Sequence, residues 1–122
     1  MEFKGTEPLY IQVAKYLEGE IFSDKYPLGT KIPGVRELSA DLVINGRTVQ
    51  SALNKLVDEG LLETKRGLGN FVITDKARFN EIKHQKIEKM TQGFIEESLT
   101  LVSSAELRHI FLSALEQSKG DE

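Results

Sequence analysis

Apolar side chains recur at helical spacing in three stretches of the first half of the chain. The first stretch begins near Thr6, a candidate cap, and Pro8, a first-turn proline. Its apolar positions are Leu9, Val13, Ala14, Leu17 and Ile21. The second stretch covers residues 34–42 and the third residues 46–59, with Gly60 at the position of a helix stop. The pattern predicts three helices, and a tight turn separates the last two.

Two short strand-like stretches follow the third predicted helix. Residues 61–65 and 70–74 flank a Gly-Leu-Gly turn, and residues 30–32 indicate one more short strand. The third helix has one apolar face, which we expect to point to the core. That face consists of Val49, Ala52, Leu53, Leu56 and Val57. This order of elements is that of a winged helix-turn-helix, which places one helix in the major groove of DNA.

The last third of the chain predicts two further amphipathic helices. The first covers residues 76–99, and Ser103 and Glu106 have the spacing of a capping box that starts the second. Their apolar faces exceed what a small winged helix can cover, so we expect them to hold two copies of the chain together. The alternative is that they fold back on their own domain. The residues assigned to dimerisation are Phe79, Ile82, Ile87, Met90, Phe94, Leu107, Ile110, Phe111, Ala114 and Leu115.

These elements define a fold class and two regions. The fold class is mostly α with a small β-wing (α+β): a winged helix-turn-helix DNA-binding domain at residues 1–75 and a helical dimerisation segment at residues 76–122. A hydrophobic content of 39% with 29% charged residues is typical of a globular protein. No apolar run is long enough to span a membrane, so we expect a cytoplasmic protein.

Charge and side-chain chemistry narrow the classes of function. The net charge of −3 argues against indiscriminate nucleic-acid binding, so any DNA contact has to come from a local basic patch. The absence of cysteine excludes disulfides, thiolate metal sites and cysteine nucleophiles. His84 and His109 lack metal-ligand spacing, and Ser103 and Ser104 lack the context of a nucleophile elbow. We therefore expect no enzyme activity, no cofactor and no metal.

Polar and basic residues at the start of the third helix form the candidate DNA-reading face. Arg47, Thr48, Gln50 and Ser51 occupy its first turns, where a recognition helix meets base edges, and Arg36 opens the helix before it. A cation near a helix N-terminus opposes the macrodipole and loses roughly 0.3–1 kcal/mol of stabilisation, so two such placements indicate a function. The alternative is that this is the ordinary polar face of a surface helix.

Lys65 and Arg66 precede the Gly67-Leu68-Gly69 turn of the predicted hairpin. Two cations before a glycine turn can approach a phosphate or reach into a minor groove. The alternative is a plain hairpin whose glycines serve turn geometry alone. Because the hairpin follows directly on the third helix, we favour DNA contact through Lys65, Arg66, Gly67 and Gly69.

Short motifs over about residues 7–72 resemble those of the GntR family of bacterial transcription regulators. The motifs are Pro8-Leu9-Tyr10-Ile11-Gln12, Gly29 with Ile32-Pro33, Arg36-Glu37-Leu38, Arg47-Thr48-Val49, Glu59-Gly60-Leu61, Arg66-Gly67 and Gly69-Asn70-Phe71-Val72. The resemblance implies DNA contacts at Arg36, Asn45, Arg47, Thr48 and Gln50, the last at a position that varies with operator sequence. The short tail resembles the YtrA-type branch, whose members add only two helices for dimerisation, whereas larger members carry a ligand-binding domain.

The chain departs from the family pattern at four positions. Gly34 stands where a serine usually caps the second helix. Val43 stands at the usual glycine of the interhelical turn, where we expect a strained or rearranged backbone. Gly46 contributes no side chain, and Leu68 replaces a common lysine and so removes one expected phosphate contact. We expect these changes to affect affinity and site preference but not the class of protein.

The sequence thus predicts a sequence-specific regulator of transcription, a repressor that binds double-stranded DNA as a homodimer. A second class is a winged-helix module for protein interaction, favoured by the acidic net charge and by Leu68. An unknown small-molecule effector in the dimer cleft is compatible with the first class. The resemblance also suggests control of neighbouring transporter genes, by analogy.

Overall fold

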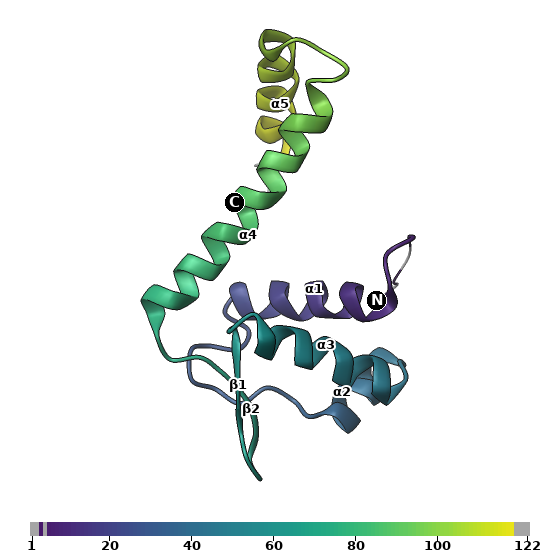
Figure 1. Cartoon of the computed structure of the whole chain (residues 1–122), viewed down its shortest axis with the longest axis vertical. Coiled ribbons are helices and arrows are strands. Elements are labelled where there is room, and N and C mark those ends of the chain that lie inside the picture. Colours follow the sequence, from purple (N-terminus) through teal and green to yellow (C-terminus); the bar gives the residue numbers. More distant parts are fainter. Residues whose placement is uncertain (1–2, 4, 119–122) are drawn as a thin grey trace. The chain divides into compact units, whose positions relative to one another are not determined.

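Five helices and one two-stranded antiparallel sheet make up the part of the chain that the computed structural model describes, residue 3 and residues 5–118. In chain order the elements are α1 (Leu9–Phe22), α2 (Val35–Leu42), α3 (Gly46–Asp58), β1 (Leu62–Lys65), β2 (Gly69–Val72), α4 (Lys76–Ser98) and α5 (Ser104–Ser118) (Figure 1). The chain divides into two compact units, Met1–Lys83 and His84–Glu122. The expected fold class, mostly α with a small β-wing, is confirmed.

The core of the first unit lies between α1 and α3. The buried side chains of α1 include Val13, Ala14, Leu17 and Ile21. Those of α3 are Val49, Ala52, Leu53 and Leu56. Their spacing is that of one helix face, so each helix turns a single apolar stripe to the other. Val57, the remaining member of the predicted stripe, is only partly buried at the edge of this core.

Most element boundaries follow their sequence signals, with two exceptions. α3 covers the predicted range, and Gly60 takes a φ of +83° just after its end. α1 instead follows Pro8 directly, and no described side chain caps it, so the prediction of a cap at Thr6 is wrong. The strand predicted at residues 30–32 is reduced to a single bridge between Lys31 and Phe71.

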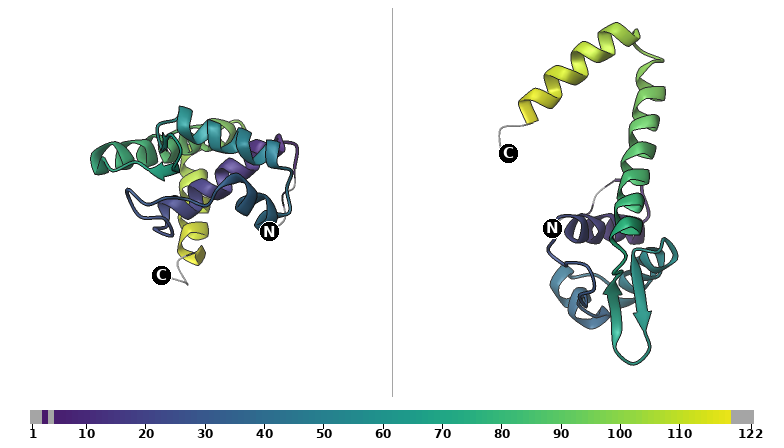
Figure 2. Two further views of the ribbon diagram at one scale, coloured as in Figure 1. Left: turned by 90° about the horizontal axis from the view of Figure 1, so that it is seen from below. Right: turned by 90° about the vertical axis from the view of Figure 1, so that its left-hand side faces the viewer.

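β1 and β2 form the hairpin predicted after α3. Leu62 pairs with Val72 and Lys65 with Gly69, and the Leu68 N–H closes the turn by donating to the Lys65 carbonyl at 2.8 Å. Leu62 and Val72 anchor the base of the hairpin because both are buried. The hairpin extends away from α1, and its turn stands clear of the helices of the first unit (Figures 1 and 2).

The first two turns of α4 belong to the core of the first unit. Phe79 and Ile82 keep exposed fractions of only 8% and 5%, and the Phe79 ring meets the Phe22 ring edge to face at a centroid distance of 5.2 Å. This corrects the assignment of Phe79 and Ile82 to the dimer surface, because both side chains are already buried by their own chain. The division between the units falls inside α4, after Lys83, rather than before the helix.

The second unit combines the later turns of α4 with α5. The Ser103 hydroxyl oxygen accepts a hydrogen bond from the Glu106 N–H at 3.2 Å, which is one half of the predicted capping box. The Phe94 and Phe111 rings lie 6.0 Å apart and join the two helices. No residue of α5 is buried, although the helix carries an apolar stripe. None of the described helices combines the length and the apolar character that a membrane crossing needs.

Candidate nucleic-acid interface

The turn between α2 and α3 is short and is tied to α2 through Ser39. The Ile44 N–H donates to the Ser39 carbonyl at 3.1 Å, and the Ser39 hydroxyl donates to the Ile44 carbonyl. Val43 lies between them in a left-handed backbone with φ 54° and ψ 52°, and its side chain is 87% exposed. The strain expected at Val43 is therefore present, since a β-branched residue rarely takes this conformation.

The N-terminal ends of α2 and α3 are neighbours. A Cβ placed on Gly46 would lie 3.5 Å from Val35 Cγ1, so the first residues of the two helices are in van der Waals reach. Arg36 and Arg47 follow these residues directly, and both arginine side chains are exposed. Two exposed cations thus follow neighbouring helix starts, which suits a phosphate-rich partner.

Asn45 caps α3. Its Oδ1 accepts a hydrogen bond from the Arg47 N–H at 2.7 Å, and its backbone carbonyl accepts from the N–H groups of Thr48 and Val49 at 3.0 and 3.1 Å. With Oδ1 engaged, the Asn45 side chain offers its NH2 group, a donor that can reach a phosphate oxygen. Asn45 therefore suits a backbone contact better than a base contact that needs both its oxygen and its nitrogen.

The exposed face of α3 is polar. Gln50 and Ser51 are exposed, and Thr48 is half-buried. Gln50 Nε2 donates to Asn54 Oδ1 at 2.9 Å, one helical turn further along. The NH2 group of Gln50 has a second hydrogen, so Gln50 can bind an adenine with both of its polar atoms while Asn54 holds its carboxamide in place. Sequence reasoning missed this role of Asn54, although two amides four residues apart on one face are the signal for it.

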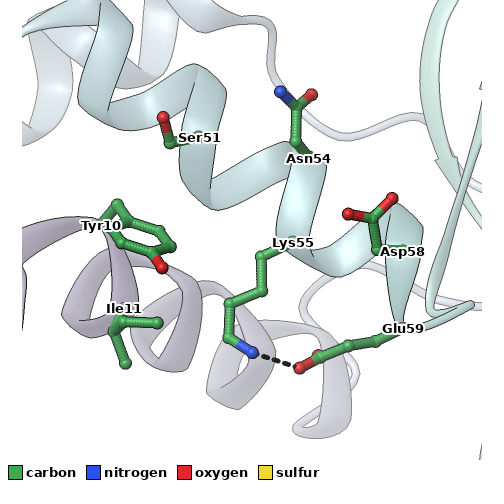
Figure 3. Close-up of a pocket in the computed structure, with 7 residues that line it drawn as sticks. All are labelled: Tyr10, Ile11, Ser51, Asn54, Lys55, Asp58 and Glu59. Carbon is green, nitrogen blue, oxygen red and sulfur yellow. Dashed lines mark hydrogen bonds and ion pairs between the residues drawn. The ribbon is translucent and has the colours of Figure 1, made fainter.

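An open hollow of about 490 Å³ lies between α1 and α3, lined in part by Tyr10 and Ser51 (Figure 3). Lys55 reaches from α3 toward α1, and its Nζ lies 2.6 Å from Glu59 Oε2. Because Glu59 neutralises Lys55 and Asp58 adds a negative charge to the same lining, this hollow repels phosphate. Ser51 belongs both to the polar face of α3 and to the lining of this hollow.

The turn of the hairpin presents two exposed cations, Lys65 and Arg66. The Lys65 ammonium lies 4.5 Å from the centre of the Phe71 ring, a cation–π contact that holds the lysine against the hairpin. Gly67 and Gly69 have φ values of +79° and +119°, which glycine adopts far more readily than other residues. The glycines thus set the shape of the turn, and the cations supply its charge.

Within the described part of the chain, three exposed arginines on α2, α3 and the hairpin lack the ion pairs that several other cations form. Lys15 and Lys25 each lie 2.6 Å from a glutamate oxygen. Arg36, Arg47 and Arg66, in contrast, form no ion pair with any residue that the structure describes. This acidic chain therefore carries exposed arginines without a described ion-pair partner at the starts of α2 and α3 and at the hairpin turn.

Sequence reasoning missed Lys31. A Cβ placed on Gly69 would lie 2.8 Å from Lys31 Cε, so the lysine stem crosses the hairpin at this glycine. The bridge between Lys31 and Phe71 holds the stem there. Lys31 thus adds a cation beside Lys65, and because the contact joins distant segments, no local pattern in the sequence signals it.

The described residues offer no group of three or more His, Asp or Glu side chains arranged to hold a metal ion. His84 lies 3.4 Å from Glu88, one turn along α4. The exposed cations Arg36, Arg47, Lys65 and Arg66 lie on α2, α3 and the hairpin, which also carry exposed carboxylates at Glu37 and Glu63. The cations can bind the phosphates of a polyanion.

The sequence of this chain is similar to a known protein family and to several known proteins. The family model described as "Bacterial regulatory proteins, gntR family" matches residues 9–72, from α1 to the end of β2. The HTH-type transcriptional repressor YtrA of Bacillus subtilis (strain 168) is 32% identical over 69 residues, which cover 57% of this chain and 53% of YtrA. The uncharacterized HTH-type transcriptional regulator YhcF of the same strain is 26% identical over 96 residues, 79% of each chain. YisV and YdfD, two further regulators of that strain, match over only 14% of their own length.

Solved structures share the fold. A GntR family transcriptional regulator from Listeria monocytogenes has a TM-score of 0.78 at 29% identity, over 88% of this chain and 96% of that one. The DNA-binding domain of AraR in complex with operator ORR3 has a TM-score of 0.53 at 30% identity, over 59% of this chain and 87% of that one. A domain similar to part of this chain thus binds operator DNA in AraR.

Proposed function

This chain belongs to the GntR family of bacterial regulatory proteins, which matches residues 9–72 of its 122, and we propose that it represses transcription by binding a specific double-stranded operator as a homodimer. Its family and its winged helix-turn-helix make it a transcriptional regulator. Operator specificity, the dimer and repression are the proposal. The observation that carries it is the meeting of the N-terminal ends of α2 and α3, where Arg36 and Arg47 are exposed.

We assign base reading to the first turns of α3. Arg47 can pair with O6 and N7 of guanine, and Gln50, whose carboxamide is held by Asn54, with N6 and N7 of adenine. Thr48 and Ser51 provide shorter hydroxyl contacts on the same stretch of helix. A good two-bond contact from an arginine or a glutamine is worth about 1–3 kcal/mol of discrimination against the wrong base.

We assign the phosphate backbone to the residues around the base-reading helix. Cations and backbone N–H groups at helix ends fix the orientation of a protein on DNA without reading sequence. Gly67 and Gly69 let the backbone of the turn approach closely because they carry no side chain. The side chains that we assign to phosphate are those of Arg36, Asn45, Lys65 and Arg66.

The homodimer is assigned to the second unit. Met90 is 69% exposed, and Ile110 and Phe111 are 49% and 44% exposed. Phe94, Leu107 and Phe111 also line an apolar groove of about 370 Å³ within this unit. A contiguous exposed apolar surface on a small unit is typical of a protein–protein interface, and a two-fold operator requires two copies. Ile87, Ala114 and Leu115, which are also exposed, complete the proposed surface.

Repression, location and regulation extend the proposal. YtrA bears the name of a transcriptional repressor, and we propose the same outcome for this chain, in the cytoplasm and without catalysis by the protein itself. A dimer seated on an operator excludes other proteins from the same DNA. A small-molecule effector that entered the apolar groove would compete with the second copy and so release the operator.

A binding-site selection from random duplexes, followed by sedimentation of the protein on the enriched duplex, tests this proposal. We expect one two-fold symmetric motif, two chains on each duplex, and an affinity roughly 10³-fold or more above that for random duplex. If no motif is enriched, the chain is better explained as a protein-interaction module, which the net charge of −3 and the 61% exposure of Leu68 support. A motif bound by a single chain would overturn only the dimer.

A further inference from the structure

Leu68 lies in the turn of the hairpin with little around it. Leu68 is 61% exposed. Among the described large apolar residues of the first unit, only Val43 is more exposed. No heavy atom lies within 4 Å of the place where a Cβ on Gly67 would stand. The Leu68 N–H, which donates to the Lys65 carbonyl at 2.8 Å, closes the turn through the backbone, so the turn does not depend on the leucine side chain.

A single exposed leucine is ordinary on a protein surface, so its exposure alone carries no inference. Its surroundings set it apart. Arg66 is exposed two residues before Leu68, the Lys65 ammonium is held 4.5 Å from the Phe71 ring, and the Lys31 stem crosses the hairpin at Gly69. The turn therefore presents an apolar side chain, with Arg66 beside it and Lys65 and Lys31 at the adjoining end of the hairpin.

This distribution of charge matches the cross-section of a DNA minor groove. The rims of the groove are lines of phosphates, which attract lysine and arginine, and its floor consists of base edges. Minor-groove proteins frequently insert apolar side chains at base steps, while their basic and amide side chains read the groove and its width. A lysine at the tip, by contrast, would seek a phosphate at the rim.

On the basis of the DNA binding proposed above, we propose that Leu68 enters the minor groove beside the base pairs read by α3 and selects A·T pairs there. Leucine has no hydrogen-bond donor or acceptor on its side chain, so it distinguishes base pairs by shape. At a G·C pair the N2 amino group of guanine projects from the floor of the minor groove into the space that the leucine needs. At an A·T pair the floor lacks this group, so the leucine can approach it.

The test uses three versions of the selected operator in which the base pairs flanking each arm are A·T, G·C or inosine·C. Inosine keeps the major-groove O6 and N7 of guanine but lacks the N2 amino group, so it isolates the minor groove. We expect wild-type protein to bind the A·T and inosine·C versions alike and the G·C version roughly 5- to 10-fold more weakly. Leu68→Ala should bind all three versions alike.

Arg66→Ala is the matched control, because it removes a neighbouring cation and leaves the leucine. It should weaken binding to all three duplexes by a similar factor and keep the ratio between them. Wild-type binding to inosine·C as weak as to G·C would overturn the inference, and so would an undiminished G·C penalty in Leu68→Ala. Equal affinity of the wild-type protein for all three duplexes would overturn only the role of Leu68. If the selection enriches no operator, the proposed function is overturned as well.

Discussion

The carboxamide oxygen of Asn45 accepts a hydrogen bond from the backbone N–H of Arg47 at 2.7 Å. This cap fixes the first turn of α3 and with it the direction in which the Arg47 side chain leaves the helix. Just before it, Val43 takes a left-handed backbone that leads the chain out of α2. A strained turn and a capped helix start together position the residues that we assign to base reading.

Substitutions at Asn45 separate capping from DNA contact. Aspartate also caps and its charge suits a helix N-terminus, so Asn45→Asp should keep its free energy of unfolding, while Asn45→Ala should lose about 1 kcal/mol. For operator affinity we expect the opposite ranking of the two variants. Asn45→Asp should bind the operator more weakly than Asn45→Ala, because its carboxylate would face a phosphate. Urea unfolding and operator titration of both variants measure the two effects. Operator binding by Asn45→Asp as tight as that of wild type would show that Asn45 faces no phosphate.

Val43→Gly should stabilise the protein. Glycine takes a φ of 54° and a ψ of 52° without the steric strain of a β-branched residue, so the free energy of unfolding should rise by about 1 kcal/mol. Val43→Ala is the control, since it removes the exposed methyl groups but keeps a Cβ, and it should gain less. Chemical unfolding of the two variants decides the point, and a less stable glycine variant would contradict the left-handed turn.

Lys31→Met should make operator binding less sensitive to salt. Methionine keeps much of the stem that crosses Gly69 and removes the charge, so thermal stability should hold. The slope of log affinity against log salt should become shallower by about one for each phosphate that the protein no longer neutralises, or about two for a dimer. Lys15→Met, which removes a lysine of α1 that lies 2.6 Å from a Glu7 oxygen, should leave the slope unchanged. Equal slopes for wild type and Lys31→Met would remove Lys31 from the interface.

Phe111→Asp should dissociate the dimer. It places a charge in the proposed contact between copies, where an unpaired buried charge costs several kcal/mol, about 3 or more. Leu101→Asp makes the same change at a side chain that is 81% exposed and lies outside the groove, so it should leave the dimer intact. Sedimentation at micromolar concentration distinguishes the two. A monomeric wild-type protein, or a dimeric Phe111→Asp variant, would contradict the assignment.

Periodicity predicted the helices well because burial repeats with the helical turn. The apolar positions of α3 are those that the structure buries, from Val49 to Leu56. The same pattern misassigned Phe79 and Ile82, since an apolar stripe shows that a face is covered but not what covers it. In α4 the early turns pack in the first unit, whereas Met90, further along, stays exposed.

Local sequence signals located the candidate site only in part. The family motifs and the helix starts indicated Arg36 and Arg47, and the structure places both on adjoining helix ends. Lys31 escaped because its contact with Gly69 forms only after the chain folds. The cap at Asn45, in contrast, had a local signal, because asparagine just before a helix is a common N-cap residue.

A binding-site selection run in parallel on wild type and Arg47→Ala tests most directly whether α3 reads base edges. The Arg47 side chain is exposed, so the variant should fold, and a thermal melt verifies this. We expect the variant to lose about 1–3 kcal/mol per half-site and to relax its preference at one base pair in each arm, with the arms about 10 bp or a multiple apart. A folded variant that selects an unchanged motif would contradict base reading by Arg47 and leave it a contact to the phosphate backbone.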